Sequence, residues 1–113
     1  MKIFNYIAIE TKKAESCSSD VRVRWLITKE MGANNFAMRL FEIEPEGNSP
    51  LHTHPWEHEV FILEGEGVVF DGDKSTPFEA NDVVFVPSDE RHQFKNTGKK
   101  RLKFLCLIPY CKQ

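Results

Sequence analysis

Short apolar runs alternate with turn-forming residues along this chain. Runs rich in Val, Ile, Phe and Leu recur between Gly, Pro, Asn and Asp, and the 3.6-residue periodicity of amphipathic helices is almost absent. This pattern predicts an all-β protein, because closely spaced strands of this kind are typical of a sandwich or small barrel. We expect the following strands: 22–28, 36–44, 49–54, 58–64, 67–71, 82–86, 91–96 and 102–108, with 2–9 as an additional edge strand or swapped arm.

The composition describes one globular domain spanning residues 1–113. A hydrophobic content of 41% and this length suffice for a core without disulfides. The net charge of -2 gives no overall attraction to nucleic acid or to an anionic membrane, and no apolar run approaches the roughly 20 residues that cross a bilayer. Cys17, Cys106 and Cys111 are odd in number and no secretory signal pattern opens the chain, so we expect a cytoplasmic location.

All four histidines fall into one metal-ligand pattern. His52, His54 and His58 form H-x-H-x-x-x-H, and His92 lies in a separate strand-like segment. Imidazole is the commonest metal ligand, and residues two apart on a strand share a face, so His52 and His54 can bind one ion. A single histidine is more often a surface or core residue, but the spacing of the whole set favours a shared metal site.

The segment around the first three histidines resembles the first motif of the cupin superfamily, a family of small β-barrels that hold a metal ion. The motif is G-x5-H-x-H-x3,4-E-x6-G. His52 and His54 match its histidine pair, His58 stands where glutamate is usual, and Gly65 closes it. The opening glycine comes one place late, at Gly47.

The second cupin motif, G-x5-P-x-G-x2-H-x3-N, is matched by Pro87, His92 and Asn96, while Asn81 and Asp89 replace its two glycines. Asn and Asp are the non-glycine residues best able to adopt a left-handed backbone, so we expect both turns to form with Asn81 and Asp89 in place of glycine. The resemblance implies a double-stranded β-helix, or jelly roll. With four histidines, the chain resembles the small single-domain cupins that bind manganese and often dimerise.

Two glutamates flank the third histidine and are rival ligands. A spacing of x4 after His54 would select Glu59, whereas the x6 distance to Gly65 selects position 58. We favour His58. Glu57 and Glu59 would then point away from the ion, or accept hydrogen bonds from the ligand imidazoles.

Strand alternation also predicts an inward arginine. Glu42 and Glu44 should face water, which sends three residues of the same run inward: Arg39, Phe41 and Ile43. An inward arginine needs an anionic partner. Two roles remain open for Arg39, namely a salt bridge with an acidic neighbour at the barrel rim, or binding of a substrate carboxylate or phosphate beside the metal.

In the run 102–108, Lys103 should face water, which sends Phe104 and Cys106 inward to the pocket. Phe104 either packs in the core or forms a wall for a substrate. Cys106 is either a small buried hydrophobe or a reactive or ligating thiol. For both residues packing is the more common role.

The run 58–64 is apolar on both faces. An inward His58 leaves Phe61 and Leu63 on the opposite side of the sheet. Such a side is normally covered by another sheet or by a partner subunit. We therefore predict a homodimer.

Four neutral imidazoles would leave the dipositive charge of the ion uncompensated, which favours anionic oxygen ligands. An octahedral ion would keep two open positions, so we expect Mn(II) first and Fe(II) next. Ni(II) and Cu(II) are further candidates, and tetrahedral Zn(II) would be structural.

Three functions are compatible with such a site. The first is a manganese- or iron-dependent enzyme, an oxygenase or isomerase, acting on a small oxygen-rich or carboxylated molecule. The second is a non-catalytic module that binds a small metabolite or metal, and the third is an inert scaffold with a structural ion. No general base and no catalytic residue is identifiable, and no helix with a basic face would read DNA.

Overall fold

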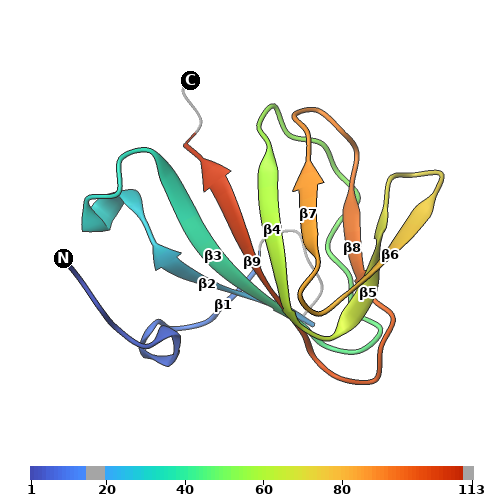
Figure 1. Cartoon of the computed structure of the whole chain (residues 1–113), viewed down its shortest axis with the longest axis horizontal. Coiled ribbons are helices and arrows are strands. Elements are labelled where there is room, and N and C mark those ends of the chain that lie inside the picture. Colours follow the sequence, from blue (N-terminus) through green and yellow to red (C-terminus); the bar gives the residue numbers. More distant parts are fainter. Residues whose placement is uncertain (15–19, 111–113) are drawn as a thin grey trace.

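Two antiparallel sheets make up the computed structural model, which describes residues 1–14 and 20–110. Figure 1 shows them facing each other, with the six-stranded sheet on the left. That sheet has the order β1-β2-β3-β9-β4-β7: β1 (Lys12–Lys13), β2 (Val21–Ile27), β3 (Phe36–Ile43), β9 (Leu102–Pro109), β4 (His58–Glu64) and β7 (Val83–Val86). The second sheet has the order β6-β5-β8: β6 (Ser75–Glu79), β5 (Glu66–Phe70) and β8 (Gln93–Asn96).

Within residues 1–14 and 20–110, helix is limited to two single 3-10 turns, η1 (Tyr6–Ala8) and η2 (Lys29–Met31). In the described part of the chain, no helix is long and apolar enough to cross a membrane. The arrangement confirms the predicted all-β class and is that of a small jelly roll.

The core lies between the two sheets and follows the alternation of the strands. On β4, His58, Val60 and Ile62 are buried, whereas Glu59 and Phe61 are exposed. Alternate residues of every core strand meet in one buried cluster: Ala14, Val21, Val23, Ile43, Val60, Ile62, Phe78, Val86, Phe94, Leu102, Phe104 and Cys106.

The strand predicted over 49–54 does not form. The one β-bridge of this segment joins His52 to His92, and a second bridge just before it joins Asn48 to Lys95. Ser49 and His54 add single backbone hydrogen bonds, to Phe94 and from Asp89. Pro50 lies within the segment and Pro55 follows it, and proline supplies no N–H to a ladder.

Strand β6 is absent from the sequence prediction. Its residues, Ser-Thr-Pro-Phe-Glu, include Pro77 and lack an apolar alternation. Proline is tolerated on the edge strand of a sheet, and β6 is an edge strand paired to β5.

Residues 2–9 do not form the predicted edge strand. They contain η1, whose first turn is capped by Asn5 through a 3.0 Å bond from the Ile7 N–H to Asn5 Oδ1. The alternative of a swapped arm stays a prediction.

The two non-glycine residues at the glycine positions of the second motif adopt the left-handed backbone, as predicted. The φ angles are 77° for Asn81 and 68° for Asp89. The opening glycine of the first motif should lie six residues before His52, and Glu46 at that position also has a positive φ, of 70°. The turn thus keeps the usual conformation although its glycine is displaced.

Glu42 is buried, with 7% of its surface exposed, so the prediction that it faces water is wrong. Its carboxylate accepts a hydrogen bond from Arg24 Nε at 3.2 Å and another from Arg101 Nη1 at 3.2 Å. Arg101 Nε also donates to Glu44 at 2.7 Å, and the Glu44 side chain is half exposed as expected. Two guanidinium groups therefore replace water around Glu42.

Gly67 supplies a test of the fold, because a Cβ there would collide with the backbone carbonyl oxygen of Lys95 on β8. We expect Gly67→Ala to lower the free energy of unfolding by about 1–3 kcal/mol, as overpacking does. Gly98→Ala is the control, since its Cβ would meet the exposed side chain of Glu66, which can move. Urea unfolding followed by circular dichroism measures both, and equal losses would contradict this account of β5.

Candidate metal centre

Three histidines gather at one end of the space between the sheets. One ligand nitrogen from each of His52, His54 and His92 lies within 4.8 Å of the others. The Nε2 atoms of His52 and His54 are 3.1 Å apart. The bridge between the backbones of His52 and His92 brings the two sequence segments together. The arrangement fits the donor geometry of a metal site.

His58 lies beside this trio, on β4. Its ring centroid is 5.2 Å from that of His54 and 5.0 Å from that of His92. The residue is 6% exposed, and its Nε2 is buried without a hydrogen-bond partner. A buried nitrogen without a partner costs free energy unless something binds it. The structure therefore brings all four predicted histidines together, three of them tightly.

Neighbouring groups hold two of the rings in place. His92 Nδ1 lies 2.9 Å from the Glu90 carbonyl oxygen. Because a carbonyl can only accept, Nδ1 carries the proton there and Nε2 keeps its lone pair, the usual arrangement of a ligating histidine. The His54 ring stacks on Trp56 with centroids 4.4 Å apart and planes at 8°.

The environment of His52, His54 and His58 lowers their pKa values and so favours the neutral imidazole, which is the form that binds metal. Burial lowers the pKa of His58 to about 3 and that of His52 to about 4, and the nearby histidines and Arg39 add to the effect. Burial also lowers the pKa of His54. Among the described residues no carboxylate joins the trio, and Glu57 and Glu59 are exposed, as the alternation predicts.

Arg39 lies behind His58. Its Nη2 is 3.1 Å from Cys106 Sγ and 3.5 Å from His58 Nδ1. Its guanidinium packs against the rings of Trp25 at 5.3 Å and Phe41 at 4.8 Å. Among the described residues it makes no ion pair, and its Nε is buried without a partner. The rim salt bridge considered for Arg39 is thus not found.

Phe104 and Cys106 point inward, as predicted. Phe104 packs in the core, with ring centroids 5.4 Å from Phe41 and 4.9 Å from Phe94. Cys106 Sγ lies 3.2 Å from His58 Nδ1. Burial raises the pKa of the Cys106 thiol, although the charge of Arg39 opposes the rise.

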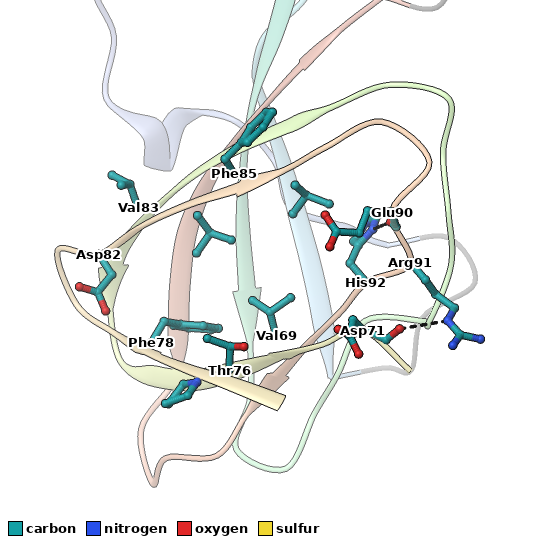
Figure 2. Close-up of a pocket in the computed structure, with 13 residues that line it drawn as sticks. Val69, Asp71, Thr76, Phe78, Asp82, Val83, Phe85, Glu90, Arg91 and His92 are labelled. Carbon is teal, nitrogen blue, oxygen red and sulfur yellow. Dashed lines mark hydrogen bonds between the residues drawn. The ribbon is translucent and has the colours of Figure 1, made fainter. Parts of the chain in front are cut away.

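A cleft of about 480 Å³ opens between β7 and the three-stranded sheet. Figure 2 shows Asp71, Glu90, Arg91 and His92 at one end, with Asp82 at the opposite end. Its lining is mixed, because these polar groups share it with apolar side chains, among them Val69, Phe78, Val84 and Val86. Its volume is in the range of small-molecule sites.

Sequence reasoning missed this cleft because β6, which forms one wall, was not predicted. His92 is the one predicted site residue that lines it; Arg39, Phe104 and Cys106 do not.

The cupin domain model matches residues 39–108, so the chain belongs to the cupin family. That assignment agrees with the jelly-roll architecture and with the histidines between its sheets.

Two characterised relatives place the chain within this family. It is 40% identical over 93 residues to an oxalate-binding protein of Thermotoga maritima, covering 79% of this chain and 75% of that protein. It is 35% identical over 71 residues to 1-methylthio-D-xylulose 5-phosphate methylsulfurylase of Rhodospirillum rubrum, covering 63% of this chain and 46% of that enzyme. The chain thus spans less than half of the second relative.

Two solved structures are closely similar. The polyketide cyclase RemF from Streptomyces resistomycificus superposes with a TM-score of 0.90 at 28% identity, covering 96% of this chain and 79% of that one. A predicted oxalate decarboxylase from Thermotoga maritima superposes with a TM-score of 0.84 at 30% identity, covering 97% of this chain and 100% of that one.

Proposed function

We propose that His52, His54, His58 and His92 bind one divalent metal ion, and that the protein binds a small carboxylated molecule through that ion. The observation that carries this proposal is the cluster of three imidazole nitrogens within 4.8 Å, beside the buried and unpartnered Nε2 of His58. Buried polar atoms without partners are rare in folded proteins. One bound cation would accept a lone pair from each of these four imidazole nitrogens.

Mn(II) is the ion that we favour, followed by Fe(II), because the chain resembles manganese-binding cupins and both ions accept an octahedral site with open positions; imidazole donors alone bind the later metals more strongly. Four neutral donors leave two places of an octahedral ion for other ligands, and they leave its charge uncompensated. Ni(II), Cu(II) and Zn(II) bind imidazole as well, so the metal content of purified protein will depend on supply.

Charge favours an anionic ligand of the oxalate class. The trio contains no carboxylate, and the guanidinium of Arg39 lies 3.5 Å from His58 Nδ1. A dicarboxylate can fill two adjacent coordination positions with its oxygens. The similarity to an oxalate-binding protein supports this choice.

Catalysis is the second candidate, as a metal-dependent oxygenase or isomerase. The cleft beside His92 favours it, because a volume of about 480 Å³ with apolar side chains in its lining accommodates a larger organic body than oxalate has. The similarity to RemF points the same way. A bound ion would supply Lewis acidity, while the apolar side chains of the cleft, such as Phe78 and Val86, would orient the substrate.

Replacing one histidine tests the ligand set. We expect His58→Ala to lower metal affinity at least about tenfold, because one donor is lost. Glu59→Ala should leave affinity unchanged, since that side chain is exposed on the outer face of β4. Titration calorimetry and metal analysis of the apo and reloaded proteins measure both, and the opposite pattern would show that Glu59 is the third ligand.

Oxalate tests the ligand class. We expect Mn(II)-loaded protein to bind oxalate at least about tenfold more tightly than acetate, about 1.4 kcal/mol, because oxalate chelates. The metal-free protein should bind neither. Equal binding of oxalate with and without metal would refute the proposal, and oxygen consumption or turnover with diketones, phenols or hydroxy acids would favour the enzyme.

We infer that two copies of the chain associate through the outer face of the six-stranded sheet. An outer patch there consists of Phe61, Leu63, Val83 and Phe85, and the last two are 74% and 61% exposed. Phe61 and Val83 are cross-strand neighbours, so the patch is continuous. No second sheet of the described chain covers it. An isologous dimer would bury the same patch on both copies.

A charge in the patch tests the dimer. We expect Val83→Glu to convert a dimer into a monomer at micromolar concentration, because it buries a carboxylate in an apolar interface. Val68→Glu, on the outer face of β5, is the matched control and should stay dimeric. Light scattering after gel filtration measures the mass. A monomeric wild type would refute the interface.

We also propose a reducing, cytoplasmic location. Cys106 is a free buried thiol, and Cys17 and Cys111 lie outside the described residues.

A further inference from the structure

We propose that Cys106 and Arg39 are positioning residues for the metal centre: the Cys106 sulfur accepts a hydrogen bond from the Nδ1–H of His58, which leaves the Nε2 of His58 unprotonated and free to bind the ion, and Arg39 holds that sulfur in place. This inference rests on the proposed metal site and adds to it the reason why His58 can act as a ligand.

The register of three strands places these side chains together. Arg39 on β3 is the cross-strand partner of Cys106 on β9, and Cys106 is the partner of Val60 on β4, two residues from His58. All point to the inner side of the six-stranded sheet. The sulfur lies 3.2 Å from His58 Nδ1 and 3.1 Å from Arg39 Nη2. Two nitrogen groups therefore converge on one sulfur atom.

The chemistry of imidazole makes this contact decisive. A neutral histidine carries one proton, on Nδ1 or on Nε2. Nε2 can bind a metal only if the proton is on Nδ1, and a ligating histidine normally donates that proton to a nearby acceptor. His92 meets the condition through the Glu90 carbonyl, 2.9 Å from its Nδ1.

His58 has no such carbonyl. Within the described residues, its Nδ1 has two polar neighbours, Cys106 Sγ and Arg39 Nη2. A guanidinium has donors and no acceptor, so it cannot take the proton. The sulfur is the remaining acceptor. Without it, a proton on Nδ1 would face the cationic Arg39, and the proton would move to Nε2, where it blocks the metal.

Arg39 has the complementary role. Its Nη2 donates to the sulfur at 3.1 Å, while its guanidinium is fixed between Trp25 and Phe41. A sulfur that accepts one hydrogen bond from Arg39 still has a second lone pair, which it can offer to the N–H of His58. Arg39 thus influences the metal site through Cys106 and His58, without contacting the ion.

The experiment compares three variants with Co(II) as the metal probe, whose optical and X-ray absorption spectra report its ligands. We expect Cys106→Ala to bind Co(II) about 10–100-fold more weakly than wild type, with three imidazoles in place of four. Cys106→Ser should restore the Co(II) affinity and the fourth imidazole ligand, because a hydroxyl oxygen also accepts a hydrogen bond. Nitrogen-15 NMR of the metal-free proteins should show the His58 proton on Nε2 in Cys106→Ala.

Val60→Ala is the matched control, since it leaves a cavity beside Cys106 but removes no acceptor. It should lose thermal stability and keep four imidazoles and wild-type Co(II) affinity. Equal weakening in Val60→Ala would show that packing alone matters and would overturn the inference. The inference would also be overturned if Cys106→Ala kept four imidazole ligands and the Co(II) affinity of the wild type.

Two results separate this inference from the metal site itself. A sulfur-to-cobalt charge-transfer band in the wild type, absent from Cys106→Ser, would make Cys106 a direct ligand and would refute the positioning role while the metal site stood. If wild-type protein bound Co(II) through His52, His54 and His92 alone, the positioning role would likewise be refuted and the metal site would stand. Wild-type protein that bound no Co(II) would refute both proposals.

Discussion

Two hydrogen bonds between the backbones of His52 and His92 determine the whole arrangement of the centre. The His52 N–H donates to the His92 carbonyl at 3.2 Å, and the His92 N–H donates to the His52 carbonyl at 3.0 Å. These bonds join an irregular segment, bounded by prolines, to the residue that precedes β8. The histidine trio depends on this junction, because it joins the segment of His52 and His54 to His92, while β4 places His58 beside them. Local pairing, rather than a continuous ladder, brings the donors together.

The sequence contains much of this arrangement, since the spacing of the histidines and the alternation of β4 and β9 suffice to place His58, Phe104 and Cys106 inside. The left-handed turns at Asn81 and Asp89 also follow from residue chemistry. Strand β6 and the cleft do not follow, because a polar edge strand that contains proline has no periodic signal. Nor does the burial of Glu42, because Arg24 and Arg101 are distant in sequence and only the fold brings them to it.

The charged groups around Glu42 and those around the histidine cluster are arranged differently. Around Glu42, arginines and carboxylates neutralise one another on the flank of the six-stranded sheet. At the histidine cluster, Glu57 and Glu59 are exposed, and Arg39 beside His58 is occupied by a sulfur and two aromatic rings, while Asp71, Glu90 and Arg91 line the adjoining cleft. The first site stabilises the fold, whereas the second leaves positive potential available for a ligand. The chain thus places its uncompensated charge where binding is proposed.

The jelly roll is not sealed along one side, since β7 and β6 are the outer strands of their sheets and the cleft lies between them. Pro77 deprives β6 of a backbone donor, which discourages the two edges from joining by hydrogen bonds. A small molecule can therefore reach His92 from the side, along the gap between the two edge strands, without breaking any hydrogen bond of the sheets.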